Sequence, residues 1–111
     1  MTQKYRIRFF FELGVTAYLW AGDDFTLDTF DVGPIEDKLP LSDEIRQRAE
    51  EISDWYQTSV DWDYPPAPTP WSEEECDQFR IIAREFFEDL QQELGDDFEL
   101  LYDQIEPRPG D

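Results

Sequence analysis

The chain has 111 residues, which fits a single domain spanning residues 1–111, and its 28 acidic residues against nine basic ones give a formal charge of −19. Hydrophobic residues make up 40% of it, which is enough for a core and argues against a disordered chain. The charge also argues against direct binding to nucleic acid or to an anionic membrane, because both would repel it. We therefore expect a basic protein partner, which long-range attraction would help to capture.

The charge is distributed unevenly along the chain. Residues 1–20 contain three basic residues and one acid, whereas residues 21–111 contain 27 acids and six basic residues. We therefore expect the acidic surface on the helices and their connecting loop rather than on the first strand. The alternative is that the acidity only keeps the protein soluble, since a large net charge does this without any partner.

The N-terminal part of the chain predicts a β-hairpin followed by an irregular segment. Apolar side chains alternate through residues 4–12, as in a half-buried strand. The buried face of this strand would hold Tyr5, Ile7, Phe9 and Phe11. Gly14 can turn the chain, and residues 15–20 are expected to form the second strand. Glycines and prolines interrupt residues 21–40, which leaves open a short strand or a turn of helix around Phe25–Phe30.

A first helix is predicted to begin after Ser42, a good N-cap, and to end near Thr58. Asp43 and Glu44 would place negative charge at the positive end of its dipole. Its apolar stripe would consist of Ile45, Ala49, Ile52 and Tyr56. A loop is expected over residues 60–71, because the four prolines there exclude regular structure.

A second and longer helix, of about 22 residues and roughly 33 Å, gives the clearest local signal. Ser72 and Glu75 match a capping box, Trp71 and Cys76 stand where a hydrophobic staple would lie, and Gly95 is the expected C-terminal breaker. The apolar stripe of this helix would hold Cys76, Phe79, Ala83, Phe86, Phe87, Leu90 and Leu94.

The C-terminal residues predict a last strand over 97–105, followed by a frayed tail over 106–111. One face of the strand would carry Phe98, Leu100 and Tyr102. Each of these elements has one clearly apolar face, so the natural packing is a sheet covered by helices. The sequence therefore predicts an α+β fold, in which a small antiparallel or mixed sheet (the N-terminal hairpin plus the C-terminal strand) packs against two helices.

The residues needed for most enzymatic chemistry are absent. The sequence has no histidine, which removes the commonest general base and metal ligand, and no glycine-rich phosphate loop. One cysteine without histidine cannot form a usual zinc site, and neither Asp61 with Asp63 nor the Asp23, Asp24 and Asp28 cluster has the spacing of a calcium loop. We therefore expect no enzymatic activity, no metal and no cofactor.

The same composition indicates where the protein works. Cys76 is the only cysteine, so it cannot form a disulfide within the chain, which suits a reducing compartment. No apolar run approaches the ~20 residues that span a bilayer, and the N-terminus lacks the pattern of a signal peptide. We therefore expect a cytoplasmic protein.

Two surfaces are candidates for binding a partner. The outer face of the second helix would combine acids with one exposed apolar residue, and the region from the end of the first helix into the loop mixes rings with carboxylates. The first set is Glu74, Asp77, Ile81, Glu85 and Glu88. The second set is Asp54, Asp61, Trp62, Asp63 and Tyr64. The alternatives are a merely solvated helix face and rings that fill the gap between the helices, as expected for Tyr56 and Trp71.

Four motifs between residues 19 and 75 carry a resemblance. They are Leu19-Trp20-Ala21-Gly22, Leu39-Pro40-Leu41-Ser42, Asp61-Trp62-Asp63-Tyr64-Pro65-Pro66 and Trp71-Ser72-Glu73-Glu74-Glu75. They resemble motifs of short acidic bacterial proteins, some of which are similar to immunity proteins of polymorphic toxin systems. Such proteins neutralise a toxin made by the same or a sister cell. The resemblance assigns no functional residues.

The sequence thus favours an immunity-type protein that binds a basic toxin, of the nuclease class, and blocks it by electrostatic occlusion. Two alternatives stay open. One is a DNA mimic that inhibits a DNA-binding protein, since carboxylates one helical turn apart approach the spacing of backbone phosphates. The other is a regulatory binding module in which the acidity is incidental.

Overall fold

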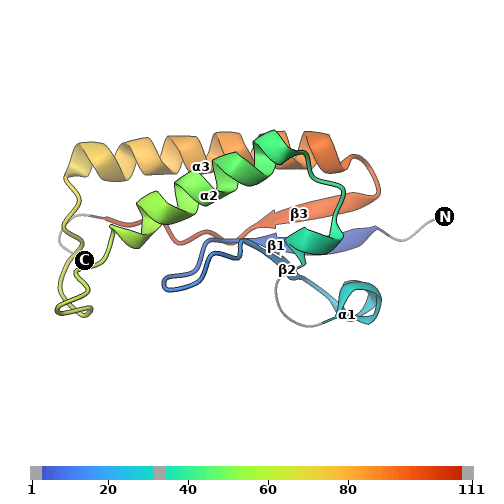
Figure 1. Cartoon of the computed structure of the whole chain (residues 1–111), viewed down its shortest axis with the longest axis horizontal. Helices are drawn as coiled ribbons and strands as arrows, with labels where there is room; N and C mark the ends of the chain where they lie inside the picture. The colour runs from blue at the N-terminus through green and yellow to red at the C-terminus, as the bar shows by residue number, and fades with distance from the viewer. Residues whose placement is uncertain (1–3, 32–34, 109–111) are drawn as a thin grey trace.

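The computed structural model describes residues 4–31 and 35–108. It forms an elongated molecule of 47 × 23 × 23 Å, in which a small sheet lies beneath two long helices (Figure 1). In chain order the elements are β1 (Tyr5–Phe9), β2 (Leu19–Ala21), α1 (Asp24–Phe30), the 3₁₀ helix η1 (Glu36–Lys38), α2 (Asp43–Gln57), α3 (Glu73–Leu94) and β3 (Phe98–Tyr102). The predicted α+β class is confirmed.

The sheet is mixed and has the strand order β2-β1-β3. β1 and β2 are antiparallel, with Phe9 opposite Leu19, so the predicted hairpin is confirmed. β3 runs parallel to β1, with Ile7 opposite Leu100. A parallel pair needs a long crossover, and α2 and α3 lie within this one. The crossover therefore places both long helices over the sheet, as Figure 1 shows.

The second strand is shorter than predicted, because residues 15–18 belong to the connection between the two strands. Gly14 turns the chain at φ 80°, as expected. The side chain of Gln57, on α2, satisfies backbone groups of this connection. Its Oε1 accepts a hydrogen bond from Gly14 N at 2.6 Å, and its Nε2 donates to Glu12 O at 3.1 Å. These bonds attach the connection to α2.

The segment that the sequence left open is a short helix, α1. Asp23 caps it, accepting a hydrogen bond from Thr26 N at 2.9 Å. Phe25 stacks on Tyr5 of β1 with ring centroids 4.9 Å apart, and Thr26 is fully buried. The helix is therefore held by side-chain contacts with β1, which the local sequence pattern does not reveal.

Local capping signals explain the bounds of α2 and α3. Ser42 and Ser72 each accept a bond from the backbone amide three residues on, and Gly95 ends α3 at φ 81°, so these predictions are confirmed. The carboxylate of Glu75 accepts a hydrogen bond from Trp55 Nε1 at 2.8 Å, which ties α3 to α2. The half of the capping box made by Ser72 is therefore observed, while the Glu75 side chain connects the two helices.

The core lies between the helices and the sheet. Phe9 of β1 and both Phe79 and Phe86 of α3 are fully buried there. The predicted inner faces of both helices are buried, except that Phe87 is only partly buried against the core. β3 covers five residues rather than nine. The predicted tail over 106–111 falls partly outside the described residues, and its first residue, Glu106, contacts Tyr102 and α3.

Candidate partner-binding site

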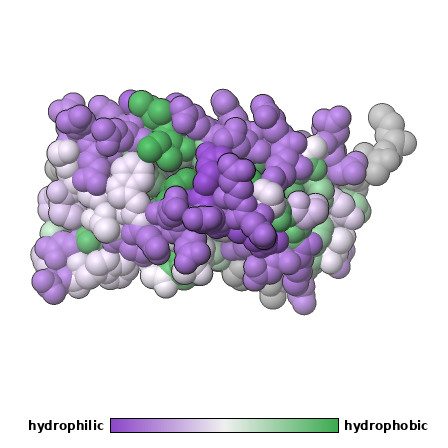
Figure 2. Space-filling model, turned by 45° about the horizontal axis from the view of Figure 1, so that its top comes forward, coloured by the Kyte–Doolittle hydropathy of each residue, from purple (hydrophilic) through white to green (hydrophobic). Residues whose placement is uncertain are grey.

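The first candidate surface is a single exposed stripe on α3, which we call the α3 ridge (Glu74, Asp77, Ile81, Glu85 and Glu88). These residues follow one another three or four positions apart, and all five are exposed. Ile81 is 53% exposed, and its neighbour Ile82 is 38% exposed. Figure 2 shows a hydrophobic patch over α3 on an otherwise largely hydrophilic face. The ridge therefore combines carboxylates with an apolar contact point.

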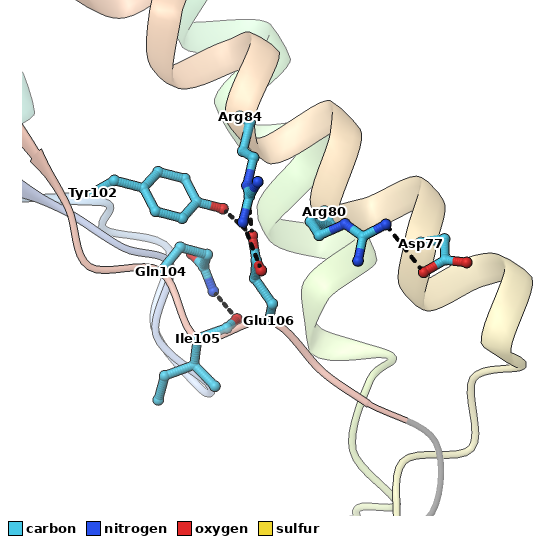
Figure 3. A network of polar contacts seen from close by, with 7 residues as sticks. All are labelled: Asp77, Arg80, Arg84, Tyr102, Gln104, Ile105 and Glu106. Carbon is cyan, nitrogen blue, oxygen red and sulfur yellow. Dashed lines mark hydrogen bonds and ion pairs between the residues drawn. The ribbon is translucent and has the colours of Figure 1, made fainter.

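Two arginines interrupt the ridge, which reasoning from the acids alone missed. Arg80 pairs with Asp77 at 3.3 Å. Arg84 reaches across to Glu106, donating from Nε to Oε2 at 3.0 Å and from its terminal nitrogen to Oε1 at 3.2 Å (Figure 3). The Tyr102 hydroxyl donates to the same carboxylate at 2.9 Å. The free acidic charge of the ridge is therefore concentrated in Glu74, Glu85 and Glu88.

The second candidate surface is the loop between α2 and α3, and we call its four candidate residues Asp61–Tyr64 the aromatic loop. Trp62 is 55% exposed and Tyr64 is 62% exposed. Trp62 is nevertheless tethered, because its Nε1 donates to Gln57 O at 2.7 Å. The loop therefore offers two rings to solvent, one of them fixed by a hydrogen bond.

The neighbouring rings of Tyr56 and Trp71 fill the gap between the two helices, as the sequence predicted. Tyr56 and Trp71 are both buried. Trp71 stacks on Trp55 with ring centroids 5.2 Å apart, and its Nε1 donates to the Thr58 hydroxyl at 2.8 Å. These rings close the gap between α2 and α3 and are structural.

Asp54, the remaining candidate, lines a pocket to which the aromatic loop contributes nothing. The pocket has a volume of about 320 Å³ and lies among the β1–β2 connection, η1 and α2. Its principal lining residues are Tyr18, Glu36, Asp37, Arg46, Glu50 and Asp54. We call it the acidic pocket. Tyr18 and Glu36 were missed from the sequence, since neither lies in a motif that indicates binding.

Two of the side chains that line the acidic pocket each contain a buried polar atom without a hydrogen-bond partner. Glu36 is 7% exposed, and while its carboxylate accepts a bond from Tyr18 N at 3.1 Å, its Oε2 has no partner. The Tyr18 hydroxyl, in a side chain 5% exposed, also has none. Burial, then the nearby Glu36 charge, raises the pKa of Tyr18 to about 12. Burial likewise raises the pKa of Glu36 above its ordinary value.

The described residues show no cluster built for metal chemistry. Over 4–31 and 35–108, no group of three or more acidic or cysteine side chains is arranged to hold a metal ion. Cys76 is buried, and burial, followed by neighbouring acids, raises the pKa of its thiol, which disfavours the reactive thiolate. Within the same ranges, no helix is long and apolar enough to cross a membrane.

Comparison with known proteins identifies the family of this acidic α+β chain. No curated protein matches the sequence. One family model does match, described as Serratia CdiI immunity protein-like, and it covers residues 5–104. The match runs from β1 through the end of β3 and includes both candidate surfaces and the acidic pocket. The chain therefore belongs to the Serratia CdiI immunity protein-like family.

Proposed function

We propose that this protein neutralises a cognate toxin by binding it directly, and that the toxin presents a basic surface of the kind with which nucleases hold phosphates. The observation that carries this proposal is the joint occurrence of the immunity protein family and a formal charge of −19. An acidic protein of this kind is attracted to a basic active-site cleft before contact is made. Binding there would exclude the toxin's own anionic substrate.

The α3 ridge and the aromatic loop are the proposed docking surface. The free carboxylates of Glu85 and Glu88 would accept hydrogen bonds from Arg and Lys of the toxin, while Trp62, Tyr64 and Ile81 would act as apolar anchors. Exposed Trp and Tyr side chains are the types that dominate binding energy at interfaces. The hydrogen bond from Trp62 to Gln57 supports this role, because a ring already fixed loses less entropy on binding.

The side chains on these two surfaces favour an inhibitor over a DNA mimic. A mimic needs continuous rows of negative charge and few exposed rings. Here Arg80 pairs with one ridge carboxylate, and Arg84 lies within the ridge region with its guanidinium bound to Glu106. The exposed rings of Trp62 and Tyr64 add an apolar component that a phosphate backbone lacks.

The test is to establish whether the neighbouring gene encodes a toxin, and then to measure binding of the full chain to that toxin domain. Surface plasmon resonance at 50 and 500 mM NaCl would give the association and dissociation rates. We expect tight binding at low salt and an association rate that falls as salt rises. Failure to bind at 50 mM NaCl would contradict the proposal. A toxin without nucleic-acid cleavage would contradict its nuclease part alone.

A matched pair of variants then locates the surface. Glu85→Gln/Glu88→Gln removes two charges from the ridge, and Asp96→Asn/Glu99→Gln removes two from the α3–β3 turn and β3. We expect the ridge variant to slow association about 5- to 10-fold at 50 mM NaCl, and the control less than twofold, since steering depends on charges near the contact. Equal effects of both pairs would contradict the placement on the ridge.

A further inference from the structure

An apolar groove lies at the end of the molecule where three segments meet. The β1–β2 connection, the α2–α3 loop and the segment that follows β3 come together there (Figure 1). Two adjoining hollows of about 250 and 320 Å³ lie among them, and Leu13, Tyr56 and Ile105 line both. We call the two hollows the end groove, and its principal apolar lining residues are Leu13, Tyr56, Val60, Ala67 and Ile105.

The exposed apolar side chains of the protein are concentrated around the end groove. In the described ranges seven large hydrophobic side chains are exposed, and five of them belong to these three segments. The five are Leu13, Val15, Trp62, Tyr64 and Ile105. Ile105 is 73% exposed, the largest fraction among the seven. A single exposed apolar residue is normal, whereas a concentration of them around a groove is typical of an interaction site.

Ile105 is held in its exposed position by both of its neighbours in the chain. Gln104 is buried, and its Oε1 accepts a hydrogen bond from Phe11 N at 2.6 Å. Glu106 accepts two hydrogen bonds from the guanidinium of Arg84. Figure 3 shows the Ile105 side chain pointing away from α3 and from this network. The backbone on both sides of Ile105 is therefore anchored, while the apolar side chain stays in solvent.

Leu13 is fixed in a similar manner by a side chain of α2. The two bonds from the Gln57 side chain, to Gly14 N and to Glu12 O, anchor the residues on both sides of Leu13. The carbonyl oxygen of Gln57 also accepts the hydrogen bond from Trp62 Nε1. Both apolar side chains that border the end groove are thus preorganised, and little entropy is lost when a partner buries them.

The charges around the end groove favour a basic partner. Five acidic residues and one basic residue occur in the three segments, over residues 10–15, 58–69 and 103–108. Two of these carboxylates already form ion pairs, with Arg8 and with Arg84. The remaining charges are three carboxylates and one guanidinium, those of Glu12, Asp61, Asp63 and Arg108. A second copy of this chain, with its own charge of −19, would be repelled, whereas an apolar side chain flanked by basic ones would be complementary.

We propose that the end groove receives an apolar side chain of the toxin, which inserts between Leu13 and Ile105 while basic residues beside it pair with the surrounding carboxylates. This inference rests on the proposed function and extends the docking surface across the end of the molecule. Val60 and Ala67, which line the groove, precede and follow the aromatic loop in the chain. The two surfaces are therefore continuous, and one partner can cover both.

The test measures the binding of three variants of the full chain to the cognate toxin domain by surface plasmon resonance. Ile105→Ala and Leu13→Ala each shorten one apolar side chain that borders the groove. Leu27→Ala is the matched control, because it makes the same change in a half-buried leucine of α1, at the other end of the molecule (Figure 1). Circular dichroism melting would verify that each variant is folded.

We expect Ile105→Ala to raise the dissociation constant at least about tenfold and Leu13→Ala about 3- to 10-fold, since truncating a packed apolar anchor removes its contacts. Leu27→Ala should change it by less than about twofold, because only residues at an interface carry binding energy. The two losses should appear mainly in the dissociation rate and should be equal at 50 and 500 mM NaCl, because salt screens charges and not apolar contacts. The Glu85→Gln/Glu88→Gln variant should instead slow association.

The outcomes separate this inference from the proposed function. If the wild-type chain does not bind the toxin, both are wrong. If it binds, and Ile105→Ala and Leu13→Ala both bind within about twofold of wild type, the groove is not a contact site while the proposed function stands. If one variant fails to fold, the other decides the matter.

Analytical ultracentrifugation of the chain alone tests the other occupant. We expect a monomer at 50 and at 500 mM NaCl. A dimer that Ile105→Ala dissociates would assign the end groove to a second copy of the chain and would contradict the inference.

Discussion

Replacing Tyr18 with Phe should stabilise the free protein, because the tyrosine hydroxyl contributes nothing to the folded state. The ring lies in the core, with centroids 5.8 Å from Phe11 and 6.2 Å from Phe86. The hydroxyl is buried without a hydrogen-bond partner, in a side chain that lines the acidic pocket. In the unfolded chain the same hydroxyl is bonded to water. Tyr18→Phe keeps the ring contacts and removes only the group that loses its water on folding.

The size of the effect follows from that loss. A buried polar group left unsatisfied costs about 1–3 kcal/mol, so we expect the variant to raise the free energy of unfolding by about 1–2 kcal/mol. For a chain of this size, each kcal/mol corresponds to roughly 4–8 °C in melting temperature. Urea unfolding followed by circular dichroism at pH 7 measures both the free energy of unfolding and the m-value. The free energy should rise, and the m-value should not change.

The matched control is Tyr64→Phe, the same substitution in a side chain that is 62% exposed. It should change the free energy of unfolding by less than about 0.5 kcal/mol, as surface substitutions usually do. If Tyr18→Phe instead lowers stability by more than about 0.5 kcal/mol, the hydroxyl has a partner in the folded protein, and the argument that it is buried without one fails.

Three further predictions concern stability. Burial raises the pKa of Glu36 above its value in the unfolded chain, so the folded state is favoured when Glu36 is protonated. This contribution to stability is fully present below the unfolded pKa of about 4.5 and is lost as pH rises through the folded pKa. Urea unfolding from pH 4 to 7 should thus show wild type losing stability relative to Glu36→Gln as pH rises, with Asp37, Glu50, Asp54 and Arg46 present in both. A constant difference would contradict this. Ser72→Ala, which removes the α3 cap, should cost about 1 kcal/mol in the same assay, whereas no loss would mean that the cap is dispensable. Arg84→Met should lower stability by less than Ser72→Ala does, and by still less in 1 M NaCl, because its guanidinium is largely exposed despite the two bonds to Glu106. A larger loss than that of Ser72→Ala would indicate that this network is central to the fold.

Local signals in the sequence predicted most of the elements. Ser42 and Ser72 each mark a helix start within one residue, and Gly95 marks a helix end, because capping depends on side chains only a few positions apart. The apolar stripe of α3 follows from the helical period for the same reason. The bounds of β2 were wrong, and a distant residue, Gln57, bonds to backbone groups of the preceding connection. Nothing within residues 15–18 indicates that contact.

For the candidate site, the sequence could predict only the exposure of single residues. The exposure of Ile81, Trp62 and Tyr64 is consistent with helical phase and with a proline-rich loop. The acidic pocket could not be predicted, since it depends on Tyr18 and Glu36 meeting across the chain reversal that contains α1. The ion pair between Arg84 and Glu106 spans 22 residues and likewise has no local signature.

The central claim is that this immunity protein acts by electrostatic capture of a basic toxin. The most direct measurement is the association rate of the wild-type chain with its cognate toxin domain, over a salt series from 50 to 500 mM NaCl. The account predicts binding throughout, with an association rate that falls at least about tenfold across the series while the dissociation rate changes little. Absence of binding, or an association rate independent of salt, would contradict it.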